Sequence, residues 1–232
     1  IKEAKDIEHH LNKVSMPIAG QLEREGVDIS DNMLRLCVYT LMHGLTRGAR
    51  VKSPALDFIM VSNTSLLNEI KTALQEEKLV YTEKEHFIHL LESSLSSITL
   101  SKKSSADILS LLNNTKEQIP EWFSQLSPRQ AQIVLDCWNK TDAEHLLSCH
   151  NEETADALQQ VCMIAGLGSS IVYRGGTPYI QTFARPCKRV DSSSRIFYKG
   201  RVWCPTTDAG IVIFREENKT PYVSGNSVFW NI

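Results

Sequence analysis

The sequence has no apolar run that approaches the roughly 20 residues needed to span a membrane. Its first six residues, IKEAKD, are too charged for the start of a secretory signal peptide. Both absences exclude the membrane-spanning and secreted classes in the sequence that we have. We therefore expect a soluble, intracellular protein.

Closely spaced cysteine pairs are also missing. The six cysteines are Cys37, Cys137, Cys149, Cys162, Cys187 and Cys204. None stands at the two- to four-residue spacing of a zinc site. We expect reduced thiols, several of them packed in the core.

The chain has no net positive charge, since its formal net charge is −2. Proteins that neutralise phosphates usually carry a basic footprint, so this value argues mildly against nucleic acid as a ligand. The distribution is uneven, however. Acidic residues concentrate in residues 69–92, whereas residues 174–201 hold seven basic residues and one carboxylate, Asp191. This basic segment could contact nucleic acid, or it could be a solvated charged loop.

The remaining composition, 42% hydrophobic and 22% charged residues, is ordinary for a globular protein. A Ser or Asp cap at residues 30–31 precedes residues 33–42, which are apolar on nearly every face and predict a buried helix. The pattern then predicts a buried strand at 56–61, an amphipathic helix at 65–77 and a short strand at 79–82. Residues 87–95 fit either strand or helix.

A similar pattern returns about 100 residues later. Residues 101–105, SKKSS, form a polar stretch that we interpret as a linker between two units. Ser127 and Pro128 supply a cap and a first-turn proline for a largely apolar helix at 130–140. An amphipathic helix at 152–164 and a strand at 170–173 follow. A repeat of this length indicates a duplicated domain half.

Two segments resemble the paired motifs of LAGLIDADG homing endonucleases of the intein-associated type. Residues 34–44, LRLCVYTLMHG, resemble the first motif, and residues 134–145, VLDCWNKTDAEH, resemble the second. Residues 18–31 and 151–166 are similar to the segments that precede the first motif and follow the second in that family.

The resemblance implies an α+β fold of two pseudo-symmetric αββαββα halves, with helices at about 32–43 and 131–141 packed near-parallel at the centre. It also implies site-specific cleavage of double-stranded DNA, with two motif carboxylates holding divalent cations, normally Mg²⁺. The sheets would form a saddle in the major groove. DNA-binding residues would be Arg174, Arg185, Lys188 and Arg189.

The sequence departs from the family at the metal positions. His43 stands at the first acidic position, whereas Asp142 retains the second and is the predicted metal ligand and catalytic residue. Imidazole is a poor substitute for carboxylate toward Mg²⁺. His43 could instead be a helix-terminal histidine favoured by the dipole, and Asp142 a turn residue. The alternative function is a degenerate DNA-binding module that no longer cleaves.

The tail resembles the C-terminal end of an intein splicing (Hint) domain. This similarity involves residues 198–207, 210–215 and 221–227. It implies that Asn226 cyclises and releases Ser227, whose hydroxyl earlier accepts the acyl group, and that an N-terminal intein fragment is the partner. The alternative is a β-hairpin around residues 216–219 that closes a domain.

Together these patterns predict four segments. Residues 1–21 are a lead-in, 22–112 and 113–190 are the two halves, and 191–232 are the β extension of Hint type. We further expect residues 198–223 to form strands outside the two halves. The protein would act on DNA in the cytoplasm or nucleoid of the host cell.

Overall fold

The computed structural model confirms the α+β fold class. It describes residues 15–18, 23–47, 55–61, 64–88, 93–114, 118–140, 146–183, 187–189, 197, 199, 211–216 and 220–225. The predictions on Asp142, Arg185, Asn226 and Ser227 lie outside these ranges. No helix in the described ranges is long and apolar enough to cross a membrane.

The first half alternates helices with antiparallel strands. Its elements are α2 (Asp31–His43), β2 (Gly44–Arg47), β3 (Ala55–Val61), α3 (Ser65–Glu76), β4 (Tyr81–Ile88), β5 (Ser93–Leu100) and α4 (Lys102–Leu111). The sheet order is β2-β3-β5-β4. The strand expected at 79–82 is thus the start of a longer strand, and β4 and β5 form an extended hairpin.

The second half repeats this connectivity. Its elements are the 3₁₀ helix η3 (Glu121–Gln125), α5 (Pro128–Asn139), β6 (Leu146–Ser148), α6 (Glu152–Ile164), β7 (Gly168–Arg174) and β8 (Thr177–Phe183). The sheet order β6-β8-β7 matches β3-β5-β4 in the first half, strand for strand. Both halves therefore place a strand after the central helix, then a helix, then a hairpin whose second strand pairs with that first strand.

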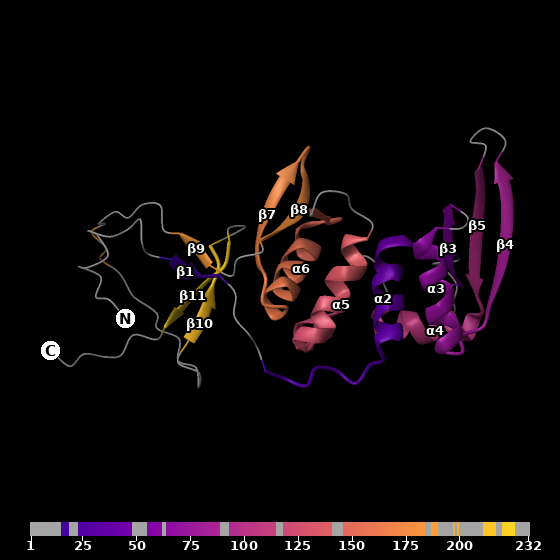
Figure 1. Cartoon of the computed structure of the whole chain (residues 1–232), viewed down its shortest axis with the longest axis horizontal. Coiled ribbons are helices and arrows are strands. Elements are labelled where there is room, and N and C mark those ends of the chain that lie inside the picture. The colour runs from indigo at the N-terminus through magenta and orange to yellow at the C-terminus, as the bar shows by residue number, and fades with distance from the viewer. Residues whose placement is uncertain are drawn as a thin grey trace.

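Helices α2 and α5 lie side by side between the two sheets (Figure 1). Arg129 in the first turn of α5 makes a two-pronged ion pair with Asp31 in the first turn of α2. Near the other ends, Cys137 lies beside Tyr39, whose pKa its thiol raises. Both contacts join residues 98 apart in sequence. The two helices therefore run parallel, which confirms the prediction made from their motifs.

The core is continuous across both halves, because the two central helices are buried on most sides. Tyr39, Phe58, Phe123 and Trp138 are its largest fully buried side chains. The buried thiols include Cys37, whose pKa burial raises to about 12, so that it packs as a small apolar side chain. The cysteines that the structure describes are free thiols, as predicted.

The polar stretch at residues 101–105 is not a linker, contrary to our interpretation of its composition. Ser101 caps α4, which begins at the next residue. The hydroxyl of buried Ser104 accepts a hydrogen bond of 2.8 Å from the Val80 amide, and that of buried Ser105 accepts one of 3.0 Å from the Leu56 amide. The serines therefore satisfy backbone groups of the first half from inside it.

Four short strands form two small sheets at one end of the molecule (Figure 1). β1 (Ser15–Pro17) pairs with β9 (Cys187–Arg189), and β10 (Ile211–Phe214) pairs with β11 (Tyr222–Gly225). β10 and β11 form the hairpin expected around residues 216–219. They pair with each other and join neither larger sheet within the described residues, as predicted for strands outside the two halves.

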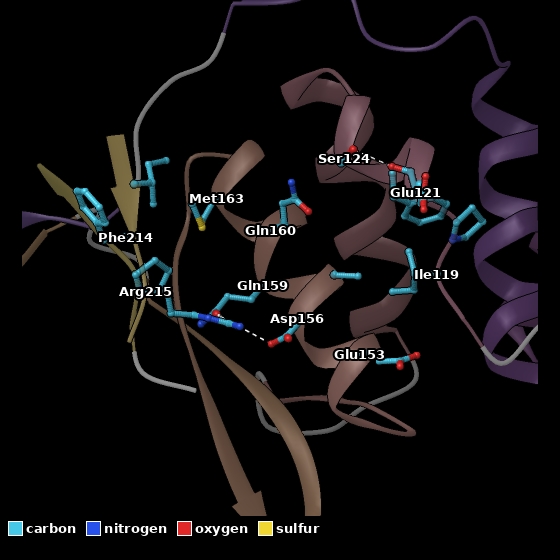
Figure 2. Close-up of a pocket in the computed structure, with 15 residues that line it drawn as sticks. Ile119, Glu121, Ser124, Glu153, Asp156, Gln159, Gln160, Met163, Phe214 and Arg215 are labelled. Atoms are coloured by element: carbon cyan, nitrogen blue, oxygen red, sulfur yellow. Dashed lines mark hydrogen bonds and ion pairs between the residues drawn. The ribbon is translucent and has the colours of Figure 1, made fainter. Parts of the chain in front are cut away.

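The β10–β11 hairpin faces α6 across an open groove of about 790 Å³ (Figure 2). Arg215 crosses this groove, where it forms an ion pair with Asp156 and donates a 2.8 Å hydrogen bond to Gln159. Met163 and Phe214 line the groove on its two sides. A single side chain of the tail is thus bonded to two consecutive turns of α6.

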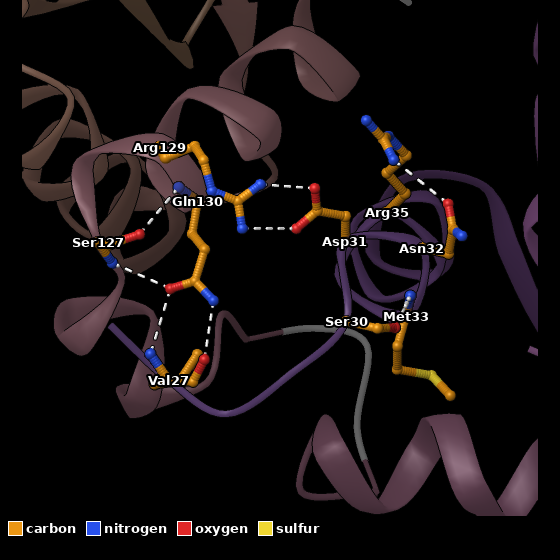
Figure 3. Close-up of polar contacts among 9 residues, drawn as sticks. All are labelled: Val27, Ser30, Asp31, Asn32, Met33, Arg35, Ser127, Arg129 and Gln130. Atoms are coloured by element: carbon orange, nitrogen blue, oxygen red, sulfur yellow. Dashed lines mark hydrogen bonds and ion pairs between the residues drawn. The ribbon is translucent and has the colours of Figure 1, made fainter. Parts of the chain in front are cut away.

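An extended strap, residues 23–30, runs from the small sheets beneath α5 to the start of α2 (Figures 1 and 3). Arg24 donates to the carbonyl oxygens of Ser124 and Leu126. The side-chain amide of buried Gln130 bonds both the N–H and the C=O of Val27, at 3.1 and 2.8 Å. The strap is therefore hydrogen-bonded to the second half before it enters the first.

Candidate nucleic-acid interface

The hairpins β4–β5 and β7–β8 flank the central helices and extend to the same side of the molecule (Figure 1). The C-terminal ends of α2 and α5 point to that side as well. The chain thus places two helix ends between two projecting hairpins. This arrangement brings the region of both motif ends and two sheets to one surface.

Helix α2 ends in a junction where a Cβ atom at position 44 would force its neighbours to shift. His43 is its last residue and is partly buried, and Gly44 begins β2 directly. A Cβ atom on Gly44 would lie 2.6 Å from the Thr40 carbonyl oxygen and 3.0 Å from Leu56 Cδ1. The Gly44 amide donates to that same oxygen and closes the helix. His43 is therefore held at the C-terminus of α2.

The first sheet has one face against the helices and one open face. Leu56, Phe58 and Ile98 are fully buried against the helices. Because side chains alternate along a strand, the register assigns the neighbouring positions to the other face. Those open-face positions include Leu45, Asp57, Ile59, Thr82, Lys84, His86, Ser97 and Thr99. Leu45 and Ile59 are 45% and 50% exposed, whereas Asp57 is buried.

The second sheet follows the same rule. Leu147, Ile171 and Ile180 are aligned across its three strands and are buried against the helices. The open face carries Ser148, Ser170, Val172, Arg174, Thr177, Tyr179 and Gln181. None of these seven side chains is acidic, and all of them except Val172 can donate a hydrogen bond through a hydroxyl, amide or guanidinium group. Such a face is suited to a polyanion.

The structure separates the basic residues that the sequence grouped. Arg174 lies on the open face at the end of β7. Lys188 and Arg189 belong to β9, which pairs with β1 in a different sheet. Arg185 lies outside the described residues. The sequence pattern therefore combined positions from two separate sheets.

The polar side chains of the second sheet escaped the sequence reasoning. Thr177, Tyr179 and Gln181 stand at every second position of residues 177–183, TPYIQTF. This alternation with Pro178 and Ile180 is the signal that could have identified a half-buried strand. Composition indicated the charged residues of this region but not these neutral hydrogen-bond donors.

The described residues contain no group of three or more His, Cys, Asp or Glu side chains that could hold a metal ion. His43 is the one predicted site residue at a motif end that the structure describes. Imidazole alone does not make a Mg²⁺ site, since that ion prefers carboxylate, carbonyl and water oxygens.

These features define a class of fold: two α+β units of matching connectivity, joined through one parallel helix pair, with both open sheet faces reaching the same side. No protein-family profile and no curated protein sequence matches the chain.

Solved structures of homing endonucleases do match it in shape. A structure of mesophilic variants of I-DmoI matches with a TM-score of 0.48 and 7% identity, over 66% of this chain and 89% of that chain. I-WcaI bound to its DNA recognition sequence matches with a TM-score of 0.45 and 18% identity, over 66% of this chain and 76% of that chain. I-DmoI with DNA and Mn matches with a TM-score of 0.47 and 8% identity, over 66% and 90%.

Proposed function

We propose that this chain is a DNA endonuclease. It binds double-stranded DNA across the open faces of its two sheets and cleaves it between the C-terminal ends of α2 and α5. The observation that carries this proposal is the parallel helix pair, whose ends meet the space between the hairpins (Figure 1). I-WcaI has been solved with its DNA recognition sequence and I-DmoI with DNA and Mn, and we extend these ligands to this chain as part of the proposal.

The open faces supply the contacts that DNA requires. The major groove admits a two-stranded β-ribbon, and each projecting hairpin is such a ribbon. Arg174 can make a bidentate contact with guanine, and Gln181 with adenine. Basic side chains, including those of the segment 174–201, would contact phosphates and set the register along the duplex. In this function the protein works inside the cell, in the cytoplasm or nucleoid.

For cleavage we propose a divalent cation, Mg²⁺, bound through Asp142. This cation supplies a hard positive charge that activates water and stabilises the leaving oxygen. Asp142 would hold it because a carboxylate is the anionic ligand that Mg²⁺ prefers. His43, at the corresponding end of α2, would donate a proton or a hydrogen bond to a phosphate oxygen.

The test is incubation with a DNA library, with and without Mg²⁺. Asp142→Asn should abolish cutting and leave DNA affinity within about threefold, since phosphate contacts come from other residues. Asp136→Asn is the matched control, because Asp136 is an exposed aspartate on α5 that accepts a bond from Gln132. Asp142→Asn protein that cuts like the parent would overturn the metal assignment.

A second candidate, binding without cleavage, is favoured by one observation. The α2 end carries a partly buried histidine where the resemblance requires an acidic residue. In this case the parent protein binds DNA and leaves it intact with Mg²⁺. His43→Asp would then add the absent carboxylate, and the appearance of Mg²⁺-dependent cutting would identify the chain as a degenerate endonuclease.

We also propose that the tail takes part in protein splicing with an N-terminal intein fragment, within a segment spanning residues 191–232. The β10–β11 hairpin supports this proposal, because β11 ends at Gly225, immediately before Asn226 and Ser227. Co-expression with an N-terminal intein fragment should release the residues that follow Asn226. Asn226→Ala should block this release, and identical products from both proteins would remove the proposal.

A further inference from the structure

A polar cluster joins the two halves near the C-terminal ends of the central helices. The Tyr39 hydroxyl on α2 donates a 2.7 Å hydrogen bond to Glu69 Oε2 on α3. Lys140, the residue that caps α5, places Nζ 2.5 Å from the same oxygen. One carboxylate oxygen therefore binds side chains from both central helices.

The ionisation states of the cluster are fixed by its surroundings. Burial raises the pKa of Tyr39, and the neighbouring Cys137 thiol and Glu69 carboxylate raise it further, so the phenol remains a donor. Burial opposes ionisation of Glu69, but the bonds from Lys140 and Tyr39 outweigh it and lower the pKa of Glu69. A neutral donor, an anion and a cation therefore coexist at neutral pH.

Stability is a poor explanation for this cluster. The Lys140 and Glu69 side chains are 45% and 34% exposed, and ion pairs with that much solvent contribute little to the free energy of unfolding. Their geometric effect is larger, because a shared acceptor oxygen fixes three side chains relative to one another. A polar contact of this kind is well suited to set the register between packed elements.

Both motif positions follow a residue of the cluster closely in the sequence. His43 follows Tyr39 by four residues of continuous α-helix, about 6 Å along its axis. Asp142 follows Lys140 by two residues, so its Cα lies within about 7 Å of the Lys140 Cα whatever the backbone conformation. Anchoring Tyr39 and Lys140 to one carboxylate thus fixes the ends of α2 and α5 relative to each other, immediately before the two motif positions in the sequence.

We propose that Tyr39, Glu69 and Lys140 form a positioning cluster that holds the C-terminal end of α5 in register with the end of α2. The inference rests on the proposed endonuclease function and deepens it. These are positioning residues, because they act through the helix ends that lead to Asp142 and His43. Glu69 is the central member, since α3 presents it to both helices at once.

The chain contains a matched control at the opposite ends of the same helices. Asp31 and Arg129 form an ion pair across the same helix interface, also near the surface, with side chains 37% and 66% exposed. Asp31→Asn removes that pair, whose Arg129 lies 11 residues before Lys140 in the sequence. It therefore removes a bond of the same kind between the halves without touching the positioning cluster.

The experiment compares Glu69→Gln and Lys140→Met with Asp31→Asn in the full chain. Deuterium uptake of the last turn of α5, residues 136–140, should rise about tenfold in the two cluster variants and stay unchanged in Asp31→Asn. The single-turnover cleavage rate at saturating DNA should fall about tenfold to a hundredfold in the cluster variants, because small misplacements of reacting groups have effects of this size. DNA affinity should stay within about threefold.

The double variant Glu69→Gln/Lys140→Met should cleave DNA no more slowly than either single variant, since all three proteins lose the same ion pair. Equal deuterium uptake in Glu69→Gln and Asp31→Asn would overturn the inference, as would additive effects in the double variant. A parent chain that cuts no DNA would overturn the proposed function instead. In that case the exchange measurement still decides whether the cluster orders the end of α5.

Discussion

A side chain at position 44 would lie in contact with the last turn of α2, and this single position links helix to sheet. The chain must leave a buried helix and enter β2 without a loop, which brings Gly44 against the Thr40 carbonyl oxygen. This junction fixes the position of His43 as the last residue of α2. At the residue scale, the glycine of the motif is therefore explained by close packing and not by an unusual backbone conformation, since its φ is −62°.

Gly44→Ala should lower the free energy of unfolding by about 1–3 kcal/mol, because overpacking forces a buried backbone to shift. Urea denaturation followed by circular dichroism measures the change. Leu45→Ala is the control, since Leu45 is 45% exposed on the open face and its truncation should have a much smaller effect. Equal stabilities of the Gly44→Ala and parent proteins would show that the junction relaxes freely.

At the scale of elements, the two hairpins differ in the chemistry of their open faces. The first sheet offers the exposed apolar groups Leu45 and Ile59 together with the cation Lys84. The second offers Arg174 and neutral donors such as Gln181. An apolar side chain can contact the thymine methyl group, whereas arginine and glutamine read purines. The two halves of a DNA site should therefore be read differently.

Arg174→Ala and Gln181→Ala should each weaken the base preference at one position in one half of the site. The free energy that discriminates against the wrong base there should fall by about 1–3 kcal/mol. Selection of bound sequences from a random DNA library measures the preference. Lys84→Ala is the matched control in the other sheet, and it should leave that half of the site unchanged. A uniform loss of affinity across all sequences would show that Arg174 contacts phosphate alone.

At the scale of the whole molecule, the chain ties its parts together through a few polar side chains. The strap crosses under α5, where Arg24 bonds it to the second half and Gln130 bonds Val27 (Figure 3), before α2 begins. Arg215 joins the tail to α6 at the far end (Figure 2). The two central helices are thus held both by their apolar faces and by segments distant in sequence.

Gln130→Ala should lower the free energy of unfolding by about 2–3 kcal/mol, because it leaves the Val27 amide and carbonyl and the Ser127 amide without their partner. Denaturant titration measures this loss. Gln132→Ala is the control, since Gln132 is an exposed glutamine on the same helix that bonds only Asp136 among the contacts described. Similar losses in both variants would argue against the strap as a stabilising element.

The sequence by itself determined the central helices, the duplicated order of elements and the terminal hairpin. These depend on local chemistry: apolar periodicity around residues 33–42, caps at Ser30 and Ser127, and β-rich runs separated by a polar turn. The residues at the helix ends could be named because the same signals fix where a helix begins and stops.

Only the tertiary structure decided which distant groups meet. Ser104 and Ser105 are polar in sequence and buried in the fold, because backbone amides of β3 and the β4 lead-in need their hydroxyls. The motifs align residues 99 apart, but the helix contacts join residues 98 apart, since side chains of packed helices interdigitate. The shared bonds of Glu69 likewise depend on three helices brought together by burial of apolar surface, which no local pattern specifies.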